Sequence, residues 1–385
     1  MAEVQGHFEP AFQNVRDRLQ NNINDGVELG AAICIIVDGK VVVDIYGGFK
    51  DEERTDPWVK DTIVNVWSST KNISTLAALV LHDRGLLDVN ENVSKYWPEF
   101  AANGKENIKV RHVLSHTSGV SAWERPFNTN DAYDLKQSTD RLAQQAPWWK
   151  PGSASGYQAI NMGHLIGELV RRVTGKSLKQ FVAEDIAGPL GADFQIGALE
   201  TDWPRIATLI PPPAMPVDLS TLDENSVAVK TFSAPALDAL AGNTAEWRRA
   251  EIGAANGHGN ARSLARILSV ITLDGKVDGH KLLSPETIDL IFHEQADGVD
   301  LAIGKPIRFG IGYAIAGGGS EESIPFVPRG KDRRACFWGG WGGSYNLMDV
   351  DKRVNVSYVM NKMGPGTLGS PRTGDYIEDI YSSLS

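Results

Sequence analysis

The chain has 385 residues, 42% of them hydrophobic, and a formal net charge of −10 at pH 7. A chain of this length buries one large core or two adjoining ones. The acidic balance argues against nucleic acid or an anionic membrane as a partner, because both need a basic surface. No apolar run approaches the roughly 18 residues that a membrane-spanning helix needs.

The first 22 residues carry acidic side chains early and lack the apolar stretch of a secretory signal. If residue 1 starts the precursor, we therefore expect a cytoplasmic protein. Two cysteines, Cys34 and Cys336, are too few for a disulfide framework, and both lie in apolar, strand-like segments. They are predicted to be buried free thiols.

Strand patterns lie at both ends of the chain and helical patterns lie between them. After a helical pattern over 8–21, two strands around the Asp38-Gly39 turn predict a hairpin. Further helices are predicted near 68–84, 162–174, 262–274 and 374–384, and further strands over 309–315, 336–338, 345–350 and 354–360. The proline-rich stretch 203–250 is predicted to cross the surface as an extended segment.

This order predicts an α/β protein with one sheet built from both ends of the chain and an inserted helical domain. Residues 1–86 and 251–385 form the predicted sheet domain, and residues 87–250 form the mostly helical one.

The stretch from Ser68 to Lys71 reads S-x-x-K, a hydroxyl followed one helical turn later by an amine. Ser68 is predicted at the N-terminus of a buried helix, with Lys71 on the same face. The helix dipole there favours an attacking alkoxide, and the amine accepts its proton if burial lowers the lysine pKa. The alternative is an ordinary helix start with a capping serine and a solvated lysine.

A second chemical element is Tyr157, on the Gly/Ser-rich turn 151–157 before the helix at 162. Beside a lysine cation its phenol pKa is expected to fall, which suits a general base that later acts as an acid. The alternative is a packing tyrosine at a helix entrance.

The third element is the glycine-rich stretch 337–344 between two predicted strands. Glycines let the backbone approach a ligand closely, and a strand edge presents a free N–H. One N–H from Ser68 and one from this strand are predicted to bind an ester oxyanion, with the indoles of Trp338 and Trp341 lining the pocket. The alternative is a β-bulge or a tight turn.

Together these motifs resemble those of the serine β-lactamase and penicillin-binding-protein superfamily. Within it the chain is similar to the class C β-lactamase-like carboxylesterases and transesterases, the family VIII type. Ser68 and Lys71 match its S-x-x-K, Tyr157 matches the tyrosine of its Y-x-N, and Trp338-Gly339-Gly340 matches its K-T-G triplet. Segments 113–119, 256–264 and 283–287 are also similar, and the resemblance runs from about residue 8 to the C-terminus.

The resemblance implies a β-lactamase/transpeptidase-like fold, in which helices flank an antiparallel sheet. It implies an active site in the cleft between the two domains. By analogy with the triplet, the second oxyanion N–H is assigned to Trp341. Gly339, Gly340 and Trp123, which lies just beyond the 113–119 segment, join the two indoles as predicted substrate contacts.

Two departures from the family pattern matter. Ala159 stands where Y-x-N has its asparagine, and Trp338 replaces the triplet lysine. Without that cation an anionic antibiotic loses its main electrostatic anchor, whereas an indole suits a neutral, apolar ester. We therefore expect weak or absent β-lactamase activity. His116 and His258 are predicted to be structural, because no G-x-S-x-G elbow accompanies them.

The sequence thus predicts a serine hydrolase that cleaves small-molecule esters through a Ser68 acyl-enzyme, with Lys71 and Tyr157 sharing the acid–base role. No Cys/His cluster, H-E-x-x-H motif or dinucleotide fingerprint suggests a metal or a cofactor. The alternatives are an acyltransferase or transesterase acting on a small metabolite, a D-amino-acid amidase or peptidase, and a non-catalytic binding protein.

Overall fold

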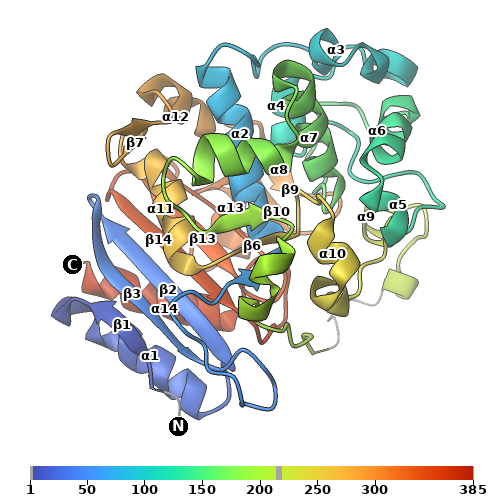
Figure 1. The fold of residues 1–385 in the computed structure, drawn as a ribbon. Coiled ribbons are helices and arrows are strands. Elements are labelled where there is room, and N and C mark those ends of the chain that lie inside the picture. Colours follow the sequence, from blue (N-terminus) through green and yellow to red (C-terminus); the bar gives the residue numbers. More distant parts are fainter. Residues whose placement is uncertain (1–2, 214–218, 385) are drawn as a thin grey trace.

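The computed structural model describes residues 3–213 and 219–384, and a nine-stranded antiparallel sheet forms its framework (Figure 1). The strand order is β1-β3-β2-β14-β13-β12-β11-β10-β9. Its strands are β1 (Gln5–Phe8), β2 (Gly30–Val37), β3 (Lys40–Gly48), β9 (Ala296–Val299), β10 (Pro306–Phe309), β11 (Ala314–Ile315), β12 (Ala335–Gly339), β13 (Tyr345–Asp349) and β14 (Val354–Met360). Because β2 pairs with β14, the predicted sheet from both ends of the chain is confirmed.

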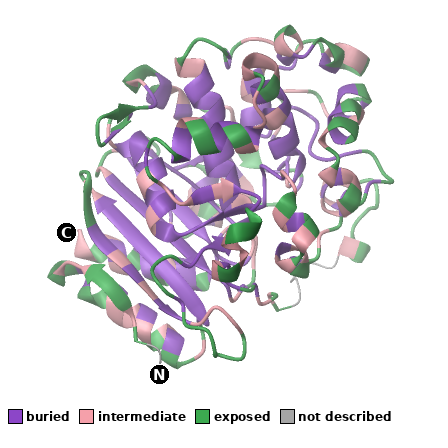
Figure 2. Cartoon of the chain, viewed as in Figure 1, coloured by how far each residue is buried: buried purple, intermediate pink, exposed green. Residues whose placement is uncertain are grey.

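Strands β2 and β14 are buried along almost their whole length because both of their faces are covered (Figure 2). On β14, Asn355 donates to Ala265 O of α11 (Ala261–Thr272) at 2.9 Å. Tyr358, three residues on, packs against Tyr376 of α14 (Pro371–Ser383). Side chains three positions apart point to opposite faces of a strand, so α11 and α14 lie on opposite sides of the sheet. Helix α1 (Gln13–Asn24) lies beside α14.

Residues 87–250 are mostly helical, and their helix α7 (Asn161–Thr174) packs on α2 (Thr70–Asp83). The other α-helices there are α3 (Val93–Tyr96), α4 (Val110–Leu114), α5 (Thr129–Tyr133), α6 (Leu135–Gln144), α8 (Leu178–Phe181), α9 (Val227–Ser233) and α10 (Ala245–Arg249). The hydrophobic core runs from the sheet into this part as one cluster. The division into two domains at residues 86 and 250 stays a prediction.

A small second sheet has the order β4-β6-β5, and its strand β4 ends three residues before Ser68. It consists of β4 (Val64–Asn65), β6 (Gly257–Gly259) and β5 (Phe194–Ile196). Outside it lie β7 (Lys276–Val277), β8 (His280–Lys281), α12 (Pro285–Ile291) and α13 (Gly319–Ser323). The short helices are η1 (Pro10–Phe12), η2 (Trp67–Ser69), η3 (Pro98–Gly104), η4 (Val182–Ala187), η5 (Glu200–Arg205), η6 (Leu219–Thr221) and η7 (Ala239–Asn243).

Three local predictions were wrong. Residues 309–315 form two strands rather than one, because the chain turns at Gly312 (φ 94°) between β10 and β11. Strand β1 precedes the first helix, which begins at Gln13. The stretch 203–250 is not simply a surface segment, since Trp247 of α10 is 1% exposed and packs against Trp67. Residues 214–218 of that stretch lie outside the described residues.

The cysteine prediction is confirmed: Cys34 on β2 and Cys336 on β12 are both buried and free. Among the described residues, every helix is too short or too polar to serve as a membrane span.

Candidate active site

Ser68 lies in η2, a single 3₁₀ turn that leads directly into α2. The preceding residue, Trp67, has φ 47°, a left-handed conformation that a bulky residue seldom adopts. Its buried ring is packed between Trp247 and Trp341, with centroid separations of 5.3 and 5.1 Å. This aromatic packing holds the strained turn and sets Ser68 at the start of a buried helix.

Lys71 lies one turn into α2, on the same face as Ser68. Its Nζ is 3.0 Å from Ser68 Oγ, 2.7 Å from Ala159 O and 2.9 Å from Ala254 O. The side chain is buried and forms no ion pair within the described chain. Burial therefore lowers the pKa of Lys71 well below its ordinary value, as the sequence argument required.

Tyr157 reaches the same hydroxyl from the turn before α7. Its phenol donates to Ser68 Oγ at 2.6 Å, and its ring centroid lies 4.7 Å from Lys71 Nζ. The expectation that its pKa falls was wrong: burial raises the pKa of Tyr157 above its ordinary value. The main reason is burial of the phenol itself, which disfavours the charged phenolate. Burial also lowers the pKa of Lys71, so the lysine gives the phenolate less help than the sequence argument assumed.

The turn between β12 and β13 brings Gly340 against the nucleophile. A Cβ atom placed on Gly340 would lie 2.4 Å from Val66 O and 3.2 Å from Ser68 N, so glycine is required there. Within the described chain, neither the Ser68 N–H nor the Trp341 N–H has a hydrogen-bond acceptor. Both N–H groups are thus free, and Gly340, the neighbour of Trp341, lies directly against Ser68.

Ser344, directly before β13, links this turn to the segment that carries the nucleophile. Its Oγ donates to Val66 O at 2.8 Å and lies 2.9 Å from Ser69 Oγ. Its carbonyl accepts the Gly340 N–H at 2.7 Å. Sequence reasoning quoted Ser344 at the end of the glycine-rich motif but gave it no role, because its partners lie 275 and 278 residues away.

Trp338 forms one side of an aromatic cluster around Tyr157. Its ring centroid lies 5.2 Å from that of Tyr157, 5.6 Å from Phe309 and 5.9 Å from His116. Trp341 is partly exposed. Gly339 is buried at the end of β12, where an added Cβ would meet the ring of Tyr345 at 3.0 Å.

The structure gives Trp123 no place in the pocket wall. The residue is fully buried, stacks on Phe127 at a centroid distance of 4.1 Å and donates its indole N–H to Ser138 O at 2.9 Å. With no exposed surface, it has nothing to present to a substrate. We correct that assignment: Trp123 is a core residue of the helical part.

The two histidines are engaged in the structure. His116 Nδ1 accepts the Gln158 N–H at 3.1 Å, and burial lowers the pKa of His116 well below its ordinary value. His258 is buried on β6, where burial lowers its pKa to about 4. The partners of the Ser68 hydroxyl within the described chain are Lys71 and Tyr157, not a histidine.

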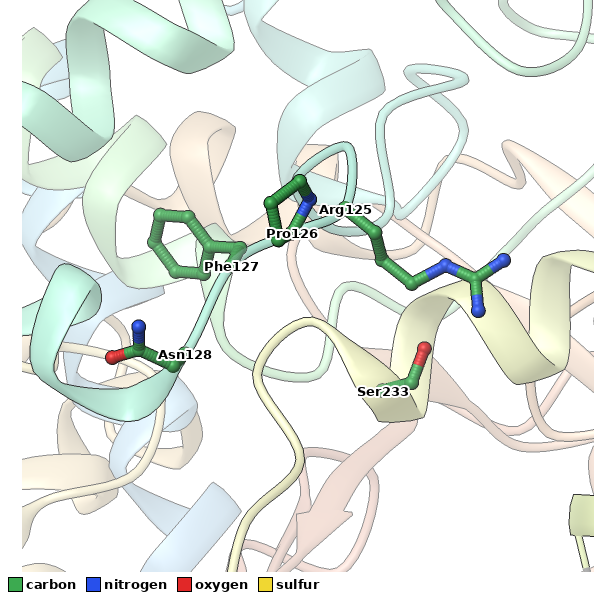
Figure 3. A pocket seen from close by; sticks show the side chains of 5 residues that line it. All are labelled: Arg125, Pro126, Phe127, Asn128 and Ser233. Carbon is green, nitrogen blue, oxygen red and sulfur yellow. The ribbon is translucent and has the colours of Figure 1, made fainter.

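A separate open pocket of about 570 Å³ lies between the 125–128 segment and the end of α9 (Figure 3). It is lined by Arg125, Pro126, Phe127, Asn128 and Ser233. Its polar groups are already engaged: Arg125 donates to Glu224 O at 3.1 Å, and Asn128 caps α5. It contains none of the reacting groups. Among the described residues, no cluster of His, Cys, Asp or Glu side chains is arranged to hold a metal ion.

The matching family model, described as beta-lactamase, covers residues 15–376. The chain belongs to the beta-lactamase family. One relative, "Esterase/beta-lactamase LipL" from Mycobacterium tuberculosis, is 34% identical to this chain over 348 residues. The match covers 87% of this chain and 77% of LipL.

Two solved structures confirm the fold of this family member. One, a family VIII carboxylesterase, superposes with a TM-score of 0.91 at 35% identity and covers 99% of this chain and 100% of its own. The other, a penicillin-binding-protein homologue from Caulobacter crescentus, has a TM-score of 0.89 at 35% identity and covers 99% of both chains. The resemblance to the β-lactamase and penicillin-binding-protein superfamily is thereby confirmed.

Proposed function

We propose that this protein is a serine hydrolase that cleaves carboxylic esters of small, neutral or apolar molecules through an acyl-enzyme on Ser68. The observation that carries the proposal is the meeting of Lys71 Nζ and the Tyr157 phenol on one serine oxygen, at 3.0 and 2.6 Å. The esterase name of LipL and the carboxylesterase description of the superposed structure support the same reaction class.

The contacts of Lys71 explain how a serine hydroxyl is activated. A neutral amine has two N–H groups and one lone pair. The carbonyls of Ala159 and Ala254 take the two N–H groups, so the lone pair faces Ser68 Oγ. The serine proton passes to the Lys71–Tyr157 pair as Oγ attacks the ester carbonyl carbon. The two groups titrate as a coupled unit, and the base is therefore assigned to the pair.

The attack converts the carbonyl oxygen into an oxyanion. In this proposal the N–H groups of Ser68 and Trp341 donate to it, and such donors stabilise the developing charge more than the ground-state carbonyl. Collapse of the tetrahedral intermediate breaks the bond to the alcohol, which leaves with the proton held by Lys71 and Tyr157. Water then attacks the acyl-enzyme with the same pair as base, and the acid is released with Ser68 restored.

The aromatic cluster sets the expected substrate class. Tyr157, which contacts the reacting oxygen, packs against Trp338, and Trp338 packs against Phe309, so apolar surface lies beside the site. Burial also lowers the pKa of Lys71. Nothing in this cluster pairs with a substrate carboxylate. We therefore propose that neutral esters are turned over and that β-lactam hydrolysis is weak or absent.

The experiment is a pre-steady-state time course of p-nitrophenyl butyrate cleavage by the wild type and Ser68→Ala. We expect a burst of p-nitrophenol equal to the enzyme concentration, absent from the variant, with an almost unchanged Tm. A variant that keeps most of the wild-type rate would refute the mechanism. An added alcohol acceptor in the steady state separates acyl transfer, which yields a new ester, from hydrolysis, which yields the acid alone.

A further inference from the structure

Asp300 is a buried carboxylate next to the reacting groups, with no role in the steps above. We propose that Asp300 is a positioning residue that fixes the backbone of Tyr157 against the nucleophile. This inference rests on the proposed role of Tyr157. It assigns a function to the loop between β9 and β10, in which none of the sequence motifs lies.

The side chain of Asp300 binds Tyr157 through its backbone. Asp300 Oδ1 accepts the N–H of Tyr157 at 3.0 Å and the N–H groups of Ala302 and Ile303 at 2.9 Å each. One oxygen therefore joins the base-bearing turn to the β9–β10 loop, across 143 residues of sequence. Asp300 is fully buried, so water does not compete for these bonds.

The loop itself is closed and docked on the tyrosine turn. The Asp300 N–H donates to Lys305 O at 3.0 Å, and its carbonyl accepts the Gly304 N–H at 2.8 Å. The neighbouring Leu301 N–H donates to Ser155 O at 2.8 Å, two residues before Tyr157. The turn that carries the phenol is thus held at two points by one rigid loop that extends from the edge of the sheet.

Stability alone does not explain a carboxylate here. Asp300 has no cationic partner within the described chain, and its Oδ2 is buried without a hydrogen-bond partner. Burial raises the pKa of Asp300 above its ordinary value, against the three N–H groups and the nearby Ser155 hydroxyl, which favour the ionised form. A buried carboxylate oxygen without a partner lowers the stability of the fold. Such groups call for a functional explanation rather than one from core packing.

The charge of Asp300 supplies a readout that a purely structural role does not. A nearby anion disfavours phenolate, and Asp300 acts on the pKa of Tyr157 in this direction. The other titratable groups facing the phenol are Lys71 from α2, Ser68 from η2 and His116 from the loop after α4. Removal of the charge should therefore lower the pKa of Tyr157.

The test compares Asp300→Ala with Asp300→Asn in full-length enzyme on p-nitrophenyl butyrate. The alanine variant loses the acceptor, and we expect kcat to fall about 10²-fold with a smaller change in KM. The asparagine variant keeps an oxygen for the three N–H groups and loses the charge. We expect it to recover most of kcat, with the ascending limb of its kcat/KM profile shifted to lower pH.

Asp349→Asn is the matched control, because Asp349 is also fully buried but lies at the far end of β13 from Ser344. It should lower the Tm and leave kcat and the pH limb unchanged. Wild-type kcat in Asp300→Ala would overturn the inference. If that variant does not fold, Asp300→Asn decides: a shifted limb supports the inference, and an unmoved one overturns it.

Tyr157→Phe separates this inference from the proposed function. If the phenylalanine variant keeps wild-type turnover, the proposed role of Tyr157 fails, whatever Asp300 does. If it is inactive while folded Asp300→Ala is fully active, only the positioning inference fails.

Discussion

Gly340→Ala tests the proposed oxyanion site with one added methyl group. The new Cβ would lie 2.4 Å from Val66 O and 2.3 Å from Ser344 Oγ, against a contact minimum of about 3.0 Å. The Ser344 side chain can rotate, but Val66 O is backbone. The turn and the nucleophile segment must therefore move apart by about 0.6 Å, which displaces the Trp341 N–H relative to Ser68.

The expected cost to catalysis follows from what such a donor contributes. Loss of one oxyanion donor lowers kcat by about 10²–10³-fold, and a misplacement of about 1 Å costs about 10²-fold. We expect kcat to fall about 10²-fold, with KM changed by less than about threefold, because the ground-state carbonyl gains little from the donor. Overpacking should also lower the free energy of unfolding by about 1–3 kcal/mol.

The assay is burst kinetics with p-nitrophenyl butyrate beside a thermal melt. Gly188→Ala is the control, since its Cβ would lie 2.7 Å from Ala183 O, at the end of η4. It imposes a similar backbone clash outside the site, so we expect a lower Tm with unchanged kcat. Folded Gly340→Ala with wild-type kcat would refute the assignment of the oxyanion N–H groups to Ser68 and Trp341.

Two further outcomes are expected. Because burial holds the pKa of Lys71 well below its ordinary value and the neutral form is the base, wild-type kcat/KM should rise with pH through the pKa of the catalytic pair. Lys71→Arg stays charged and should lose about 10²–10⁴-fold at every pH, so wild-type activity at any pH would contradict the role. Arg372→Met leaves Glu28, its buried partner at 2.6 Å, unpaired and should lower the free energy of unfolding by about 3–5 kcal/mol in urea melts. A loss below about 1 kcal/mol would contradict that pairing argument.

The features that the sequence predicts well are local or periodic. The S-x-x-K spacing and the apolar repeat after Ser68 place serine and lysine on one helical face, since a helix turn is set by neighbouring residues. The β2–β3 hairpin follows from its Asp-Gly turn for the same reason. The meeting of Ser68 and Tyr157 was expected from family resemblance alone, because no local rule joins residues so far apart.

The features that the sequence misses depend on burial and on distant partners. The pKa of Tyr157 rises rather than falls, because the electrostatics depend on how deeply α2 and the tyrosine turn are enclosed. Trp123 was predicted to line the pocket, but it packs in the core against Phe127 and His164. These contacts depend on how the helices assemble, which the sequence does not show. Asp300 could not be predicted from the sequence, because nothing around it distinguishes it from any other aspartate in a loop.

During synthesis of the protein, β2 remains without its neighbour in the sheet until β14 has been made. Roughly 320 residues separate the two strands, and ribosomes add about 5–20 residues per second, so β2 waits roughly 15–60 s for its partner. Throughout that interval one edge of an almost wholly apolar strand has no partner. Exposed apolar edges recruit other chains. A holdase that covers β2 until β14 has been made should therefore raise the soluble yield, and slower elongation, which lengthens the interval, should lower it.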